Sequence, residues 1–345
     1  MKSISTRCTH NSARAEVERI MTDEQRVWIK DLSAGSELEE VYAVRAADIR
    51  QRRGGGPYLA AVLGDRTGEV TALVWQNVDR VRGVLERGNV VRVKGQVQRY
   101  NQQLQIVIRQ AETVPGATVD EELFLRSSSI DPTLLWKRLM DAIEGIGNPD
   151  LRRLLSLVFS DPEVEERFRA APAARSMHHA FRSGLLEHTV SVVGVVRLLS
   201  EHYGLDADLV VAGALLHDLG KIWELEIAAS IEYTDDGRLI GHLPMETLFV
   251  EKKIGELEGF PRETRRQLLH ILLSHHGEYS FGSPRRPKTP EALLVHMADN
   301  LDSKMAGMLE AIAAEGSDDE AWTPYSRILE RHIYRRRLHT EDEDS

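Results

Sequence analysis

The histidines of this 345-residue chain are concentrated in one stretch, and this constrains the fold more than any other feature. Ten of the thirteen histidines lie between His178 and His296, about a third of the chain. Because His-rich stretches are typical of metal binding, this one predicts a metal site. Imidazole and carboxylate ligands together favour Zn, Mn, Fe or Ni over Ca, and the stretch has no cysteine that would select a thiolate-binding metal.

The centre of the predicted site is the pair His217-Asp218 in the run Ala-Leu-Leu-His-Asp-Leu-Gly-Lys (214–221). The residues from Asp208 up to this pair are almost wholly apolar, which predicts a buried helix that Gly220 stops. Neighbouring side chains diverge by about 100° on a helix, so a His-Asp pair shares a metal most readily at a helix end. A buried His-Asp pair needs a partner, and a cation supplies one.

The cysteine content and the length of the apolar runs indicate the cellular compartment of the protein. Cys8 is the only cysteine, so no disulfide can form within the chain and a reducing environment is favoured. Residues 1–20 lack the apolar core of a signal peptide, and nowhere do 18 apolar residues run together. We therefore expect a cytoplasmic protein with no membrane partner, in which residues 1–27 are an extension. A homo-oligomer is compatible with the sequence.

Charge is distributed unevenly. Residues 41–110 hold twelve Lys and Arg against five Asp and Glu, a local net charge of +7, so the remainder carries −17 of the total of −10. A total of −10 would argue against a nucleic-acid partner, but an average over domains hides a local field. The sequence therefore predicts a basic module attached to an acidic one.

The basic region has the pattern of short alternating strands separated by turns. The run Gly64-Asp-Arg-Thr-Gly68 marks a tight turn, the strand after it ends at Trp75, and a helical insertion is expected around 77–86. This content is that of a small closed β-barrel, and it resembles the OB-fold of the anticodon-binding type. We place this domain at residues 28–115.

Such barrels bind single strands with a basic groove and with aromatic side chains on which bases stack. The aromatic candidates are Tyr58, Trp75 and Tyr100. The basic candidates are Arg45, Arg50, Arg52, Arg53, Arg92, Lys94 and Arg99. The alternative is that Tyr58 and Trp75 belong to the barrel core and that the arginines form an ordinary solvated face.

The rest of the chain is predicted to be mostly helical. Residues 116–160 are expected to hold a linker and connecting helices, and capping residues precede a proline at Asp131-Pro132, Asn148-Pro149 and Asp161-Pro162. One β-hairpin is expected around the turn Asp235-Asp-Gly237. The second domain is placed at 161–315, and residues 316–345 are expected to hold a helix from Tyr325 to Leu338 and an acidic tail.

The His and Asp residues occur in a set order. Its five motifs are His178-His-Ala-Phe-Arg-Ser-Gly-Leu-Leu-Glu-His-Thr189, Leu215-Leu-His-Asp-Leu-Gly-Lys221, Gly241-His242, Leu273-Ser-His-His-Gly277 with Gly282-Ser-Pro284, and Ala298-Asp-Asn-Leu-Asp302. This order resembles the HD-domain phosphohydrolase superfamily. With the OB-like module in front, residues 28–315 resemble the YhaM-type 3′-5′ exoribonucleases, which couple an OB-fold to an all-α HD domain.

The resemblance implies roles for the motif residues. A first metal site would be formed by His188, His217, Asp218 and Asp299. Asp218 would bridge to a second site completed by His242, His275 and His276, where one of the two adjacent histidines could instead support the other. Lys221 would offset negative charge in the transition state, and His179 and Arg182 are candidates for phosphate contact or general acid. Asp302, one turn after Asp299, could orient a ligand.

The function that follows is hydrolysis of phosphodiester bonds in single-stranded RNA from the 3′ end, with two divalent metal ions. Polarity, the choice of RNA and the preference for Mn²⁺ follow from the resemblance alone, and short single-stranded DNA stays open as a substrate. One alternative is a phosphohydrolase of a small nucleotide. The other is a non-catalytic OB-fold RNA-binding protein. Separately, the arginines at 331 and 335–337 could contact RNA or a neighbouring subunit, although a solvated face paired with nearby acids is favoured there.

Overall fold

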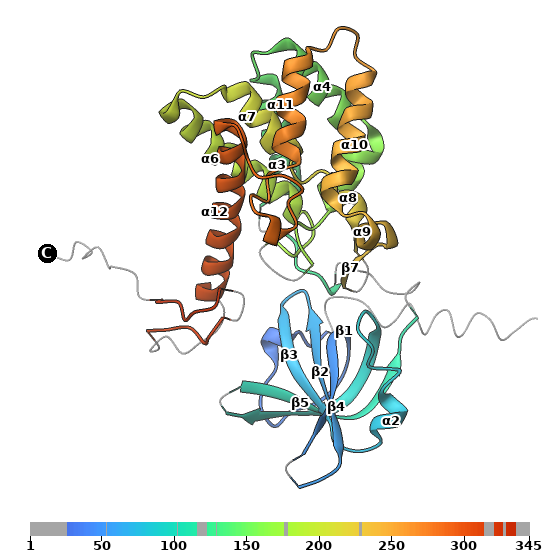
Figure 1. Cartoon of the computed structure of the whole chain (residues 1–345). Coiled ribbons are helices and arrows are strands. Elements are labelled where there is room, and N and C mark those ends of the chain that lie inside the picture. Colours follow the sequence, from blue (N-terminus) through green and yellow to red (C-terminus); the bar gives the residue numbers. More distant parts are fainter. Residues whose placement is uncertain are drawn as a thin grey trace, which may run out of the picture. The chain divides into compact units, whose positions relative to one another are not determined.

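The computed structural model describes residues 26–52, 54–101, 103–115, 123–128, 130–175, 179–227, 230–313, 321–326 and 329–335. The chain divides into two compact units, Met1–Ser127 with Ile227–Glu232, and Ser128–Glu226 with Tyr233–Ser345. The first unit contains a β-barrel and the second is a helical bundle (Figure 1). This confirms the predicted fold class, a multidomain β plus α protein.

The barrel consists of five strands closed in the order β1-β2-β3-β5-β4. The strands are β1 (Glu37–Gln51), β2 (Pro57–Asp65), β3 (Gly68–Val74), β4 (Val90–Tyr100) and β5 (Gln103–Thr113), with a short helix η3 (Ile29–Asp31) before them and one helical turn, α2 (Val78–Val81), after β3. All neighbouring strands are antiparallel except β3 and β5, which pair in parallel from Thr71 opposite Gln105 to Leu73 opposite Val107. This is the closed barrel that the strand pattern predicted.

A buried aspartate explains the Gly-Asp-x-Thr-Gly motif. The Asp65 side chain is 2% exposed, and its Oδ1 accepts hydrogen bonds from the Thr67 amide at 2.7 Å and the Thr67 hydroxyl at 2.6 Å. Its Oδ2 accepts the Ile29 amide at 2.7 Å. One carboxylate therefore closes the β2–β3 turn and also fastens η3 to the barrel, since a short side-chain acceptor can replace backbone pairing in a turn.

The helical unit follows the predicted capping signals. Its elements are α3 (Pro132–Glu144), α4 (Pro149–Phe159), α5 (Pro162–Ala170), α6 (Gly184–Tyr203), α7 (Ala207–Leu216), α8 (Lys221–Glu224), α9 (Asp235–Leu239), α10 (His242–Gly255), α11 (Arg262–Leu272), η6 (Tyr279–Phe281) and α12 (Pro290–Ala313). The side chains of Asp131, Asn148 and Asp161 each accept an amide hydrogen bond in the first turn of the helix that they precede. The three predicted helix starts are thus confirmed.

Helix α7 lies at the centre of this unit. All its residues from Leu209 to Leu216 are buried, and it contacts α3, α4, α6, α11 and α12 (Figure 1). Each fully buried Leu or Val side chain contributes about 1.5–3 kcal/mol relative to an exposed one. The apolar run before His217 therefore carries that residue into the core of the unit.

Two local predictions were wrong. Residues 235–237 begin the helix α9 rather than a hairpin turn, because the Thr234 hydroxyl accepts the Gly237 amide as an N-cap and two aspartates follow in the first turn. The two short strands there are β6 (Leu225–Ile227) and β7 (Ile231–Tyr233), which pair with each other.

The predicted helix from Tyr325 to Leu338 is also not formed in its described part. Isolated bridges pair Trp322 with Tyr334 and Ser326 with Arg331, and Glu330 has a φ of 53°, a turn conformation that a right-handed helix cannot contain. Elsewhere in the described ranges, no helix is both long and apolar enough to cross a membrane.

A close backbone approach at Gly220 gives a test of this packing. A Cβ built at Gly220 would lie 2.2 Å from the His242 carbonyl oxygen, whereas one built at Gly194, inside α6, meets nothing within 4 Å. We expect Gly220→Ala to lower the free energy of unfolding of the helical unit by about 1–3 kcal/mol through overpacking. The matched Gly194→Ala variant should instead gain about 0.5–1 kcal/mol from helix propensity. Denaturation followed by circular dichroism measures both, and equal effects would contradict the close approach.

Candidate metal centre

The predicted metal ligands converge from five parts of the helical unit. His188 lies on α6, His217 and Asp218 follow α7, His242 begins α10, His275 and His276 follow α11, and Asp299 lies on α12. His217 and His275 are fully buried, and His188 and Asp218 are 1% and 2% exposed. Residues up to 111 positions apart in sequence therefore form one buried cluster of imidazole and carboxylate groups.

The first group of ligands surrounds His188 Nε2. This nitrogen lies 3.2 Å from His217 Nε2, 3.3 Å from Asp299 Oδ1 and 3.5 Å from Asp218 Oδ2. The same two carboxylate oxygens lie 4.0 Å (Asp299) and 3.4 Å (Asp218) from His217 Nε2. Four potential ligand atoms thus face a common point.

The second group lies on the other side of Asp218. Its Oδ1 is 3.7 Å from both His242 Nε2 and His275 Nε2, and His242 Nε2 is 3.1 Å from His276 Nε2. Asp218 therefore presents Oδ2 to the first group and Oδ1 to the second. This is the geometry that a bridging carboxylate requires.

The remaining nitrogen of each of the five histidines contacts an acceptor. Nδ1 lies 2.8 Å from the Ala214 carbonyl for His217, 2.9 Å from Leu272 O for His275 and 2.9 Å from Phe281 O for His276. Nδ1 of His188 lies 2.7 Å from Asp302 Oδ2, and that of His242 lies 2.9 Å from both oxygens of Glu224. An acceptor at Nδ1 keeps the proton there and turns the Nε2 lone pair toward the cluster, as in metal sites.

The donor set fits divalent cations. His275 Nε2 is buried and has no hydrogen-bond partner among the described residues. A buried lone pair of this kind destabilises the fold unless something binds it, and a cation would do so. Groups of three potential ligands occur at His188, His217 and Asp299, and at His242, His275 and His276. Nitrogen and oxygen ligands of this kind suit a first-row transition metal.

Asp218 and three of the histidines already have the protonation state that ligation requires. Burial would raise the pKa of Asp218, but Lys221 and His217 outweigh it and hold that pKa well below its usual range. Burial lowers the pKa of His242 and of His275, and lowers the pKa of His276 to about 4, so all three are neutral near pH 7. Neutral imidazole and ionised carboxylate are the forms that bind metal.

Two buried glutamates in the cluster were not predicted from the sequence. Glu224 accepts the His242 backbone amide at 3.1 Å as well as contacting its ring, and Glu246 accepts the Gly220 amide at 3.2 Å. Glu246 is fully buried, and its burial, followed by the charge of Asp218, raises its pKa well above the usual range. The position of Glu246 one helical turn after His242 was the only local signal; nothing near Glu224 marks it as a support for a histidine.

Of the other three residues predicted to act in catalysis, two lie at the metal-ligand cluster and one does not. Lys221 Nζ lies 2.7 Å from Asp218 Oδ2, and His179 Nε2 lies 3.2 Å from Asp302 Oδ2, the oxygen that also contacts His188. Arg182 is half-buried in the turn before α6, and its side chain makes no hydrogen bond or ion pair with the described residues. Lys221 and His179 therefore join the cluster, and Arg182 does not.

On the barrel, three predicted nucleic-acid residues form one stack. The rings of Tyr58 and Trp75 lie 4.9 Å apart at 27°, and the Arg52 guanidinium lies 4.8 Å from the Trp75 ring centroid. Tyr58 and Arg52 flank the β1–β2 loop, and Tyr100, 64% exposed, flanks the β4–β5 loop. In OB-folds these two loops line the oligonucleotide groove.

Most of the other basic candidates form hydrogen bonds or ion pairs within the protein. Arg45 is largely buried and donates to the Phe124 carbonyl, Arg92 pairs with Glu112 at 3.1 Å, and Lys94 pairs with Glu39 at 2.9 Å. Arg50 lies 3.9 Å from Asp48, Arg99 is exposed without an ion pair to any described residue, and Arg53 lies outside the described residues.

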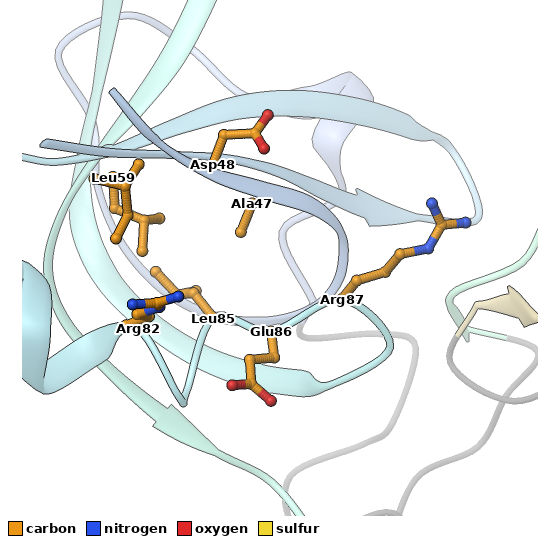
Figure 2. Close-up of a pocket in the computed structure, with 8 residues that line it drawn as sticks. Ala47, Asp48, Leu59, Arg82, Leu85, Glu86 and Arg87 are labelled. Carbon is orange, nitrogen blue, oxygen red and sulfur yellow. The ribbon is translucent and has the colours of Figure 1, made fainter. Parts of the chain in front are cut away.

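A hollow of about 380 Å³ on the barrel has none of these candidates in its lining. Figure 2 shows the side chains that line it, among them Asp48 and Glu86 as well as Arg82 and Arg87. Two carboxylates in the wall offset the two guanidinium groups. The hollow is therefore a poor site for a polyanion.

The titration of His188 gives a test of the centre. Burial would lower the pKa of His188, but hydrogen bonds to Asp299 and Asp302 outweigh it and raise that pKa to about 9. His188 is thus protonated below about pH 9, and a cation must displace this proton. We expect the affinity for Mn²⁺ to fall about tenfold per pH unit below about pH 9, the dependence for release of one proton. Calorimetry from about pH 7 to about pH 9.5 measures this, and a pH-independent affinity would contradict ligation by His188.

Comparison with known proteins agrees with both units. The family model of the HD domain matches residues 185–304, and that of the OB-fold nucleic acid binding domain matches residues 42–114. The 3′-5′ exoribonuclease YhaM of Geobacillus sp. (strain WCH70) is 32% identical over 273 residues, 79% of this chain and 83% of that protein. The enzyme of the same name from Bacillus subtilis (strain 168) is 31% identical over 280 residues, 81% of this chain and 88% of that protein. The chain therefore belongs to the YhaM family of 3′-5′ exoribonucleases.

Proposed function

We propose that this chain is a metal-dependent 3′-5′ exoribonuclease that hydrolyses the phosphodiester bonds of single-stranded RNA. The observation that carries the proposal is Asp218, whose two oxygens face two separate groups of histidines in a member of this family. We further propose two divalent cations, Mn²⁺ foremost, one in each group. A cytoplasmic location is proposed as well, supported by RNA as the substrate.

The two ligand groups would hold the cations on either side of Asp218. Cations bound in this way polarise a phosphodiester, lower the pKa of a bound water and stabilise the leaving oxygen. The chain itself holds the histidine rings in place, because Glu224, Asp302 and three backbone carbonyls contact their Nδ1 atoms. Fixed ligands avoid reorganisation during the reaction.

Lys221 supplies a positive charge at the cluster. Burial would lower its pKa, but Asp218 and Asp299 outweigh burial and raise it, so the ammonium group stays charged near pH 7. Its Nζ contacts the Asp218 oxygen that faces the first ligand group. We propose that Lys221 stabilises negative charge that develops on the phosphoryl oxygens.

The barrel would hold the strand. The exposed edge of the Tyr58–Trp75–Arg52 stack and the exposed Tyr100 ring offer surfaces for bases, and such stacking is tolerant of sequence. Because stacking alone does not distinguish ribose from deoxyribose, we include short single-stranded DNA among the proposed substrates.

The two alternatives have less support. A phosphohydrolase of a small nucleotide would not need a barrel with stacked aromatic residues. A non-catalytic RNA-binding protein would not need five histidines whose Nδ1 atoms are all engaged and whose Nε2 atoms converge in one buried cluster.

Replacement of the bridging carboxylate tests the reaction. With 5′-labelled single-stranded RNA and Mn²⁺, we expect wild-type protein to produce a ladder that shortens from the 3′ end. Asp218→Asn should reduce the rate by about 10³-fold or more, because one substitution removes a ligand from both groups. Asp141→Asn, at an exposed carboxylate on α3, should leave the rate unchanged. Shortening by Asp218→Asn at the wild-type rate would disprove the bridging role.

The aromatic stack is tested by RNA affinity. We expect Trp75→Ala to weaken binding by about 1–3 kcal/mol, the contribution of one stacked base, while Trp75→Phe keeps most of the affinity. Tyr203→Ala, at an exposed ring at the end of α6, serves as the control. Fluorescence anisotropy with labelled RNA measures all three, and equal affinities would remove Trp75 from the interface.

A further inference from the structure

A second hollow lies on the helical unit, and its charge differs from that of the hollow on the barrel. It has a volume of about 320 Å³ and lies between α11 and the segment 285–288. We call it the α11 hollow, and its lining consists of two leucines, one histidine and four cations: Leu269, Leu273, His270, Arg265, Arg266, Arg285 and Lys288. Among the residues that the structure describes, no carboxylate lines it, in contrast to the barrel hollow.

Two of the four cations have no ion-pair partner among the described residues. Arg265 forms an ion pair with Glu251, and Arg266 forms one with Glu263. Arg285 and Lys288 are exposed and form no ion pair with any residue in the part of the chain that the structure describes. Their charge is therefore available to an anion, and Leu269 and Leu273 add an apolar floor.

Backbone contacts hold these two cations against α11. The Arg285 amide donates to the Leu273 carbonyl at 3.3 Å, and the Lys288 amide donates to His270 Nε2 at 2.8 Å. Because His270 Nε2 accepts this bond, a neutral ring carries its proton on Nδ1. That N–H makes no hydrogen bond to the described residues, so it is one more donor beside the two cations.

The same segment is continuous with the metal centre. Helix α11 leads into His275 and His276, and the chain then turns back, with Phe281 O accepting from His276 Nδ1 at 2.9 Å. Leu273, which lines the hollow, precedes His275 by two residues in the sequence. Consecutive Cα atoms lie about 3.8 Å apart, so the Cα atoms of Leu273 and His275 are at most about 7.6 Å apart, and the hollow begins beside the metal centre.

We propose that the α11 hollow binds a backbone phosphate of the RNA strand whose 3′ end lies at the metal centre. Arg285 and Lys288 contact the phosphate, and Leu269 and Leu273 pack against the adjoining sugar or base. This rests on the proposed function and adds a binding site on the helical unit itself. Arginine and lysine together are the usual partners of backbone phosphates.

The test is RNA binding without cleavage. Full-length protein treated with chelator is titrated into 5′-labelled single-stranded RNA at several salt concentrations, and anisotropy gives Kd. We expect Arg285→Ala with Lys288→Ala to raise Kd about tenfold or more, because two charges that neutralise phosphate are removed. The slope of log Kd against log salt should fall by about 0.7, the contribution of the one phosphate of a single strand that the two cations neutralise.

The control removes two charges elsewhere. Arg152→Ala with Lys252→Ala changes exposed residues on α4 and α10 that form no ion pair within the described ranges, and it should leave Kd and the slope close to wild type. A Kd and slope for the first double variant equal to those of this control would overturn the proposal. A second outcome would also overturn the proposal: the Arg285→Ala, Lys288→Ala variant loses binding of adenosine monophosphate but binds RNA as tightly as wild type. The hollow would then be a site for a free nucleotide. Failure of wild-type protein to shorten RNA would instead refute the proposed function, and the binding comparison would stand.

Discussion

The helical unit depends on one buried carboxylate that faces two clusters of histidines. Asp218 is almost fully buried, and a buried charge is stable only when it is paired. Lys221 supplies one partner at 2.7 Å, and the histidine Nε2 atoms on both sides define where cations would supply the others. The apolar α7 places Asp218 there, so packing of the core and chemistry of the centre have the same origin in the sequence.

Around this carboxylate, two kinds of acceptor orient the histidine rings. Side-chain carboxylates orient His188 and His242, whereas backbone carbonyls orient His217, His275 and His276. A carboxylate that accepts a hydrogen bond from Nδ1 raises the basicity of the imidazole more than a backbone carbonyl does. The two ligand groups therefore each contain one strongly supported histidine, His188 in the first and His242 in the second.

Much of this could be predicted from residue order, because the cluster is built at helix ends that have local signals. Asp131, Asn148 and Asp161 predicted helix starts, and the apolar run predicted the burial of His217. Glu224 could not be predicted, since its partner His242 is eighteen residues away and only the fold joins them. The same holds for Arg92 and Lys94, whose charge is offset by carboxylates on neighbouring strands that the net charge of the region does not reveal.

The convergence of ligands from α6, α7, α10, α11 and α12 has a consequence for the lifetime of the protein. A cation that binds only the folded form stabilises it by RT ln(1 + [L]/Kd), and here that energy is distributed over five helices. Among the described residues, the barrel contributes none to the two ligand groups around Asp218. Metal supply would thus set how readily proteases open the helical unit, so that a metal-starved cell would lose the hydrolase to proteolysis.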